Sequence, residues 1–139
     1  MYKGKMHIII FKLLEEYFAL GLDYVKEIVC VDRITKVPMS PEYFKGVINI
    51  RGQVIPVIDL LKMLKTESKI GNSNNKKIII IEFQDELVGI VVNEVLDVME
   101  IECDKLKQSP KDTNALLYEY DGNVVTLLDI LNLLKPLTQ

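Results

Sequence analysis

The chain has 139 residues, of which 49% are hydrophobic and 27% are charged, and its formal net charge is −3. This composition is typical of a globular protein that can bury a core without a metal or disulfide. Tryptophan is absent, aromatic residues make up 7%, and 20 acidic residues outnumber 17 basic ones. Small barrels that bind nucleic acid need basic stripes with stacking aromatics, so we expect no nucleic-acid partner.

Residue types that commonly carry catalysis or bind metals are scarce. His7 is the one histidine, and Cys30 and Cys103 are two distant cysteines. They supply neither the close-spaced ligands of a zinc site nor a nucleophile with its base, and no glycine-rich phosphate loop occurs. We expect no catalytic residue, no metal and no cofactor. The cysteines are expected to be reduced thiols, buried or half-buried.

No apolar run approaches the ~18 residues of a membrane-spanning helix. The N-terminal residues 1–6 are short and polar, and the apolar run 8–11 is too brief for a signal peptide. We therefore expect a cytoplasmic protein with no direct membrane insertion.

The first predicted elements are strands. Residues 6–13 and 17–20 form two β-rich runs joined by an acidic turn, which indicates a hairpin. The apolar spacing in residues 22–29 fits either a helical turn or a strand. We expect a helical turn at 22–26 that leads into a strand at 27–31.

A proline-rich connection and a second hairpin follow. Pro38 and Pro41 predict an extended, solvent-facing segment, because proline fixes φ and lacks an amide donor. Residues 47–50 and 54–58 read as two strands, separated by the tight turn at 51–53.

Asp59 stands directly before two leucines and is predicted to cap the N-terminus of a short helix that ends near Lys65. Residues 66–77 contain Gly71 and three asparagines, which indicates a surface linker. After the linker, Asp129 is predicted to cap a second short helix over 130–134. Further strands are expected at 78–81, 87–92, 95–101, 116–120 and 123–128, with a turn or short helix at 104–106.

The two halves of the chain match at a constant offset of 70 residues. The matches include Gly52 with Gly122, Val54 with Val124 and Asp59 with Asp129. Matching turn and capping residues predict an internal duplication, with repeat halves of about 1–70 and 71–139. Many short strands with regular turn signals favour small barrels or a sandwich over βαβ units. Terminal strands can cross between the two barrels.

Arg51 stands out because it occupies the turn between two apolar strands, near Arg33, Lys45 and Glu27. A surface salt bridge there would contribute at most ~1 kcal/mol. The alternative is an arginine that anchors a protein interface, a role in which arginine is enriched. This turn therefore predicts a protein-binding surface.

Three sequence blocks resemble the CheW family of bacterial chemotaxis coupling proteins. The resemblance implies two five-stranded SH3-like β-barrels related by a pseudo-two-fold axis, with short helices and no enzymatic activity. It also implies partners: the regulatory domain of the histidine kinase CheA, the cytoplasmic tips of methyl-accepting chemoreceptors, and other CheW copies in rings. The blocks are YFALGLDYVKEIV at 17–29, ITKVPMSPEYFKGVINIRGQVIPVIDL at 34–60 and VGIVVNEVLDV at 88–98.

The same resemblance implies which residues bind partners, at a scaffold recruited to membrane-associated receptor arrays. We expect the groove between the two barrels to receive a helical receptor tip. Gly46 and Gly52 are expected to serve backbone geometry first. The predicted partner-binding residues are Val25, Glu27, Lys45, Gly46, Asn49, Arg51, Val54 and Val95.

The chain departs from the family pattern at Met39, where asparagine is common between the two prolines. This departure concerns loop detail. A coupling protein that serves a kinase pathway other than motility remains an open alternative, because the sequence does not distinguish the two pathways.

Overall fold

The computed structural model describes residues 4–64, 76–111 and 115–135. The chain divides into two compact units, and each is described by itself. Unit 1 combines Met1–Tyr24 with Glu94–Gln139, and unit 2 is Val25–Asn93. Each unit thus contains strands from both sequence halves.

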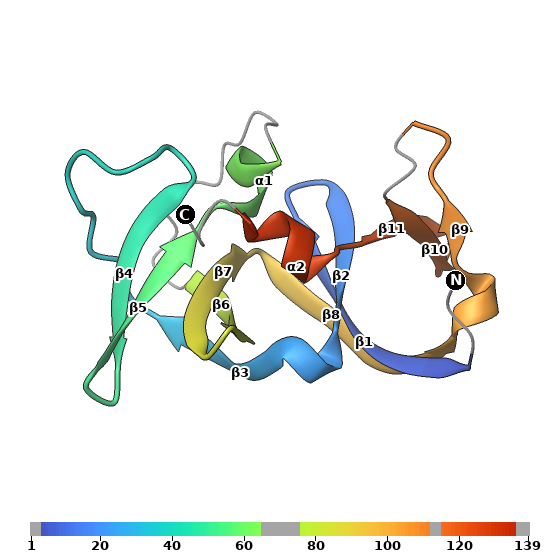
Figure 1. The fold of residues 1–139 in the computed structure, drawn as a ribbon, viewed down its shortest axis with the longest axis horizontal. Coiled ribbons are helices and arrows are strands. Elements are labelled where there is room, and N and C mark those ends of the chain that lie inside the picture. Colours follow the sequence, from blue (N-terminus) through green and yellow to red (C-terminus); the bar gives the residue numbers. More distant parts are fainter. Residues whose placement is uncertain (1–3, 65–75, 112–114, 136–139) are drawn as a thin grey trace. The chain divides into compact units, whose positions relative to one another are not determined.

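Unit 1 is built on a six-stranded sheet in the order β8-β1-β2-β11-β10-β9. Neighbouring strands in this sheet are antiparallel, except β11 and β2, which are parallel. Its elements (Figure 1) are β1 Lys5–Leu13, β2 Glu16–Gly21, η1 Leu22–Tyr24, β8 Glu94–Glu102, η2 Cys103–Lys105, β9 Lys107–Gln108, β10 Leu116–Tyr120, β11 Asn123–Leu127 and α2 Ile130–Leu133.

Unit 2 is built on a five-stranded sheet in the order β3-β6-β7-β5-β4, in which β5 and β7 are parallel. Beyond β3, Thr35 forms a bridge with Val47 on β4, so the chain leaving one edge strand reaches the other edge. This contact curls the sheet toward a barrel. Its elements are β3 Val25–Val31, β4 Phe44–Ile50, β5 Gln53–Ile58, α1 Leu60–Met63, β6 Lys76–Phe83 and β7 Glu86–Val92.

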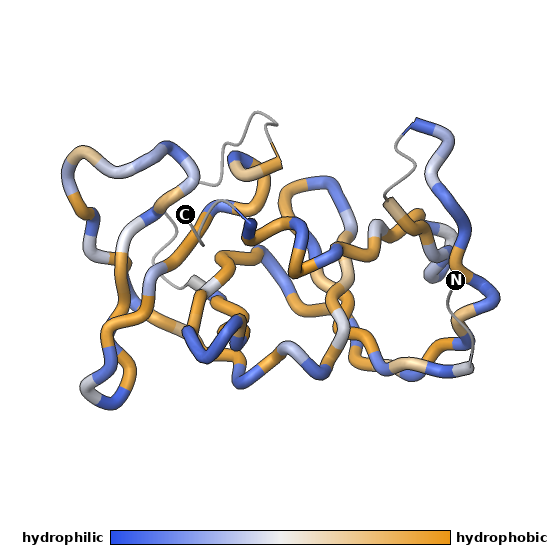
Figure 2. The backbone as a smooth tube through the Cα atoms, viewed as in Figure 1, coloured by the Kyte–Doolittle hydropathy of each residue, from blue (hydrophilic) through white to orange (hydrophobic). Residues whose placement is uncertain are grey.

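Each unit has its own apolar core, formed where strand side chains alternate between the inside and the solvent. Figure 2 shows hydrophobic stretches along the strands and hydrophilic turns between them. The core of unit 1 contains Ile8, Ile10, Ala19, Ile101, Val125 and Leu127. The core of unit 2 contains Ile48, Ile55, Val57, Ile78, Ile80 and Val91.

Both predicted helix caps are confirmed. The Asp59 carboxylate accepts a hydrogen bond from the Lys62 amide at 3.1 Å at the start of α1. The Asp129 carboxylate accepts one from the Asn132 amide at 3.3 Å at the start of α2. Asp59 is buried, whereas Asp129 is exposed, so the two caps sit in different surroundings.

The strand pairings repeat between units at the same offset of 70 residues that relates the two sequence halves. The register shift in the β1–β8 ladder also recurs in the β3–β6 ladder. This repeated register supports the predicted duplication, which itself stays a prediction. Matching pairs include Ile10–Asp97 with Ile80–Glu27, Leu127–Ala19 with Val57–Gly89, and Tyr118–Val125 with Ile48–Ile55.

Several boundaries differ from the sequence predictions. The helical turn is limited to Leu22–Tyr24, and the strand begins at Val25 rather than at residue 27. β4 begins at Phe44 instead of residue 47, and the short strand β9 was not predicted. Cys30 is exposed, so the prediction of a buried or half-buried thiol is wrong for it, because it lies on the outward face of β3.

Some predictions lie outside the described residues. They are Lys65 at the end of the first helix, nearly all of the 66–77 linker, and Pro136 after the second helix.

Candidate partner-binding surface

The β4–β5 hairpin turns at Arg51 and Gly52, whose φ angles are 51° and 83°. Two successive residues with positive φ are typical of the tight hairpin turn that matches the twist of paired strands. The Gly52 amide donates a hydrogen bond to the Asn49 side-chain oxygen at 3.0 Å. The Asn49 side chain therefore stabilises the backbone of the turn, and the Arg51 side chain projects from the hairpin tip.

Arg51 reaches across unit 2 to the edge strand β3. Its guanidinium donates a hydrogen bond to the Glu27 carboxylate, and the two residues are 24 positions apart in sequence. The Arg51 side chain is 72% exposed and that of Glu27 is 32% exposed. An ion pair this exposed adds little to stability, about 0–1 kcal/mol. Its main consequence is to fix where the two charges are presented.

An exposed valine accompanies this ion pair. Val54 is 62% exposed and lies directly opposite Asn49 in the β4–β5 ladder. Exposed apolar side chains beside an arginine are the composition expected of a protein interface. We call Glu27, Asn49, Arg51 and Val54 the Arg51 surface.

The remaining predicted residues occupy different places. Val25 is half-buried on β3 opposite Ile81, and Lys45 is half-buried on β4. Val95 belongs to unit 1, where it lies on β8 opposite Phe11.

Gly46 is buried and has a structural reason to be glycine. Its φ is 141°, and a Cβ atom there would lie 2.1 Å from the backbone oxygen of Thr35. Thr35 and Val47 exchange two backbone hydrogen bonds, of 2.9 and 2.8 Å, beside it. Gly46 thus permits the loop after β3 to cross β4, in line with the expectation that it serves backbone geometry.

Two further exposed apolar residues of unit 2 were not predicted. Ile28 is 43% exposed on β3, where it alternates with inward-facing neighbours. The predicted strand at 27–31 already contained Ile28, and the alternation of inward and outward residues along it was the available signal. Met39 is fully exposed in the loop before β4 and has a φ of 63°. It was noted only as a departure from the family pattern.

The β10–β11 hairpin of unit 1 has the same turn geometry as the β4–β5 hairpin, but its polar side chains are different. Asp121 and Gly122 form the turn with φ angles of 49° and 81°, and Val124 is 62% exposed. Here the Tyr120 hydroxyl donates a hydrogen bond to the Asp97 carboxylate at 3.0 Å. This hydrogen bond is the main reason that the pKa of Tyr120 is raised above its ordinary value of 10.0.

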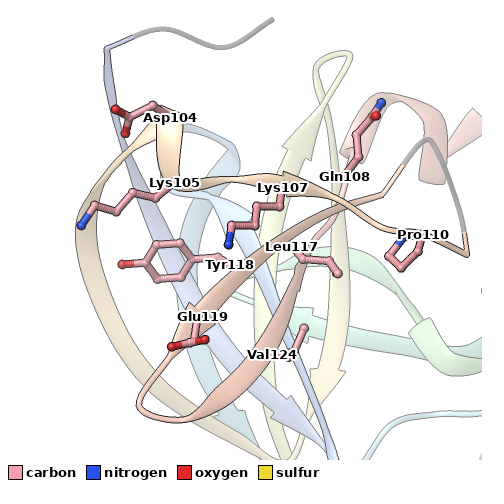
Figure 3. A pocket seen from close by; sticks show the side chains of 9 residues that line it. All are labelled: Asp104, Lys105, Lys107, Gln108, Pro110, Leu117, Tyr118, Glu119 and Val124. Atoms are coloured by element: carbon pink, nitrogen blue, oxygen red, sulfur yellow. The ribbon is translucent and has the colours of Figure 1, made fainter.

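A surface cavity of about 670 Å³ opens beside η2, β9, β10 and β11 in unit 1. Figure 3 shows Leu117 and Val124 on one side of it and Lys105 on the other. Glu119 lines the cavity at the end nearer the Asp121 turn. The cavity is thus partly apolar, with charges of both signs around it.

Within the described residues, no three His, Cys, Asp or Glu side chains gather where they could hold a metal ion. In the same residues, no helix is long and apolar enough to cross a membrane.

A sequence model of the CheW-like domain matches residues 7–137. The chemotaxis protein CheW of Thermotoga maritima is 30% identical, over 96% of this chain and 91% of that protein. CheW of Bacillus subtilis is 34% identical, over 90% of this chain and 82% of that protein. The crystal structure of the scaffolding protein TtCheW from Thermoanaerobacter tengcongensis superposes with a TM-score of 0.81 at 31% identity, covering 95% and 94% of the two chains.

Proposed function

We propose that the Arg51 surface carries the coupling function of this chain, which belongs to the CheW-like family and is a chemotaxis adaptor protein. In this role the chain acts without enzymatic activity. It bridges the cytoplasmic tips of methyl-accepting chemoreceptors and the regulatory domain of the kinase CheA, in the cytoplasm at membrane-associated arrays. Other copies of the chain are further partners in the same rings.

The observation that carries this proposal is the exposed Val54 on the hairpin whose turn residue, Arg51, forms an ion pair with Glu27 on β3. Arg51 and Glu27 hold each other in place, so less side-chain entropy is lost when a partner covers them. Val54 supplies apolar area that water currently covers. Arginine is, with tryptophan and tyrosine, one of the residue types enriched among those that dominate binding energy.

The expected strength of each contact is modest. Transient signalling contacts lie at the small end of protein interfaces, at about 1,200 Å² of total buried area or less. A receptor array joins many such contacts, and effective concentration then makes the assembly stable without any single tight bond. An adaptor that binds through a small, exposed surface fits this requirement.

The test is Arg51→Glu, which places a second carboxylate beside Glu27. We expect about 10-fold or greater loss of affinity for the receptor tip or the kinase domain, the size of an interface hot spot. Receptor control of kinase phosphorylation should be lost in a reconstituted assay. Circular dichroism and the melting temperature should stay near the wild-type values, because exposed ion pairs contribute little to stability.

The matched control is the double variant Glu27→Arg with Arg51→Glu, which restores an ion pair in the reverse direction. If Arg51 contacts a partner, the double variant stays defective in coupling. If the pair serves only to hold the hairpin against β3, the double variant recovers coupling. Normal coupling by Arg51→Glu alone would reject the proposal.

A further inference from the structure

The turn of the β4–β5 hairpin has an arginine at a position that suits other residues better. The strand ladder ends where Ile50 pairs with Gln53. Arg51 and Gly52 therefore form the whole turn, and their φ angles are both positive. Such two-residue turns favour asparagine or aspartate before the glycine, because the first residue must adopt the left-handed conformation. Arginine has no side-chain oxygen that could bond to the nearby backbone and offset the cost of this conformation.

Asn49 supplies a side-chain oxygen from the strand before the turn. Its oxygen accepts a hydrogen bond from the Gly52 amide at 3.0 Å, although both residues are exposed. This bond also fixes the orientation of the Asn49 side chain, because a backbone N–H requires an acceptor and only the oxygen of the side-chain amide is one. Since Arg51 lies between the two bonded residues, its backbone is held in the turn conformation.

The matching turn of unit 1 has the same conformation without such a bond. Asp121 and Gly122 form it with φ angles of 49° and 81°. Aspartate followed by glycine is a preferred pair for this turn. The residue that matches Asn49 is Glu119, and in the described part of unit 1 it makes no hydrogen bond to Gly122. The side-chain acceptor thus occurs in the unit whose turn begins with arginine.

The place of the Arg51 guanidinium depends on the backbone of this turn. The guanidinium donates a hydrogen bond to the Glu27 carboxylate on β3, while the Arg51 side chain remains 72% exposed. A long side chain on a turn that changes conformation would occupy more positions in the free protein, and more entropy would be lost when a partner fixes it. A turn held in one conformation reduces this loss before any partner binds.

We propose that Asn49 is a positioning residue, which affects partner binding only through Arg51. Its side-chain oxygen holds the turn in the left-handed conformation from which Arg51 reaches Glu27. The sequence predicts a direct partner contact from Asn49, whereas in this role Asn49 prepares Arg51 to make one. The inference rests on the proposed function of the Arg51 surface and adds how that surface is organised before binding.

The test is a double-mutant cycle in the reconstituted coupling assay, with the full chain, a chemoreceptor cytoplasmic fragment and the CheA-like kinase. The measured quantity is the chain concentration that gives half-maximal receptor control of kinase phosphorylation. We expect Asn49→Ala to raise this concentration about 3- to 10-fold, the effect of losing one hydrogen bond. In the Arg51→Ala background the same substitution should change it less than about twofold, because residue 51 then has no long side chain to position.

A conservative variant separates the acceptor oxygen of Asn49 from its amide N–H groups. Asn49→Ser keeps an oxygen that can reach an amide three residues later, as serine does at helix N-termini, and loses the amide donors. Nuclear magnetic resonance measures hydrogen exchange of the Gly52 amide, which should be faster in Asn49→Ala than in wild type. Asn49→Ser should retain coupling to the extent that it retains Gly52 protection. Glu119→Ala is the matched control, and it should leave exchange of the Gly122 amide unchanged.

Two results would overturn the inference. One is that Asn49→Ala raises the half-maximal concentration by the same factor with Arg51 as without it, which would mean that Asn49 contacts the partner directly. The other is that coupling does not follow Gly52 exchange in the two Asn49 variants, unchanged coupling by Asn49→Ala included. This second comparison decides alone if Arg51→Ala couples at no concentration.

Failure of the proposed function is distinguishable from failure of the positioning role. If the Arg51 surface does not carry coupling, Arg51→Glu couples normally. If only the positioning role is wrong, Arg51→Glu remains defective, and Asn49→Ala either couples as wild type does or loses coupling independently of Arg51.

Discussion

The two units share their strand pairings but differ in how a loop crosses the sheet. In unit 2, Thr35 bridges to Val47, and the residue before Val47 is Gly46, whose φ is 141°. In unit 1 the crossing segment is the short strand β9, and Lys107 pairs with Leu117. The 70-residue offset places the equivalent of Thr35 at residue 105, whereas the residue that pairs with Leu117 is Lys107, two positions later. Glycine is therefore required at residue 46, where the backbone of Thr35 comes very close, and not at residue 116, the matching position in unit 1, which is leucine.

The largest expected effect is therefore at Gly46. Gly46→Ala would place a methyl group 2.1 Å from the Thr35 backbone oxygen, and a backbone atom cannot rotate away as a side chain does. Overpacking and positive φ together should lower the free energy of unfolding by about 3 kcal/mol or more. Urea denaturation measures this change.

The matched residue in unit 1 provides the comparison. Leu116 occupies the position 70 residues after Gly46, and it is half-buried against the core of unit 1. Leu116→Ala should cost about 1–2 kcal/mol, since only part of its apolar surface is removed from water. A Gly46→Ala variant as stable as Leu116→Ala would contradict this explanation of the loop crossing.

A second pair of matched positions, in the parallel ladders, should show a smaller effect. Gly89 pairs with Val57 in unit 2, and Ala19 pairs with Leu127 in unit 1. A Cβ at Gly89 would lie 2.7 Å from the Ile78 Cγ2 atom, whereas unit 1 already buries the methyl group of Ala19.

Exchanging the two residue types should therefore destabilise the protein in both directions. Gly89→Ala is expected to cost about 1–3 kcal/mol through overpacking. Ala19→Gly is expected to cost about 1–2 kcal/mol, from the lost methyl group and the added freedom of the unfolded chain. Thermal unfolding of both variants checks the signs, and a rise in melting temperature for Gly89→Ala would show that Ile78 yields readily.

Features encoded locally were predictable from the sequence. The Asp59 and Asp129 caps and the turn at Arg51 depend on a few adjacent residues, and all three were located correctly. The start of β4 at Phe44 and the existence of β9 depend on backbone pairing with the next strand, which the periodicity of apolar residues does not report.

The same limit applies to the candidate site. Glu27 and Arg51 were both selected from the sequence, but their contact joins β3 to a hairpin 24 residues away. The exposure of Ile28 follows from the alternation of inward and outward residues along β3, whereas the apolar spacing in 22–29 fitted a helical turn as well as a strand. Val95 was grouped with Val25 and Val54, yet it belongs to the other compact unit.

The smallest predicted effect is a change in how stability depends on pH. It comes from the Tyr120–Asp97 hydrogen bond of unit 1, where unit 2 has the Arg51–Glu27 ion pair. Tyr120 donates to Asp97, and this raises the pKa of Tyr120 above 10.0, so the folded protein keeps the hydroxyl proton to higher pH than the unfolded chain. The resulting stability is fully present below pH 10 and is lost as pH rises through the folded-state pKa.

Tyr120→Phe removes both the hydrogen bond and its titration. At pH 8 this variant should be slightly less stable than wild type, and the difference should shrink as pH rises above 10, because only the wild-type unfolded chain gains from ionising this residue. Urea denaturation at the two pH values measures the difference, and absorbance at tyrosinate wavelengths follows the titration itself. A stability difference that stays constant up to pH 11 would mean that Asp97 does not hold the Tyr120 proton. Arg51→Met is the comparison variant, because it removes the ion pair of unit 2 and keeps the Tyr120–Asp97 hydrogen bond, so its stability should follow the wild-type dependence on pH above 10.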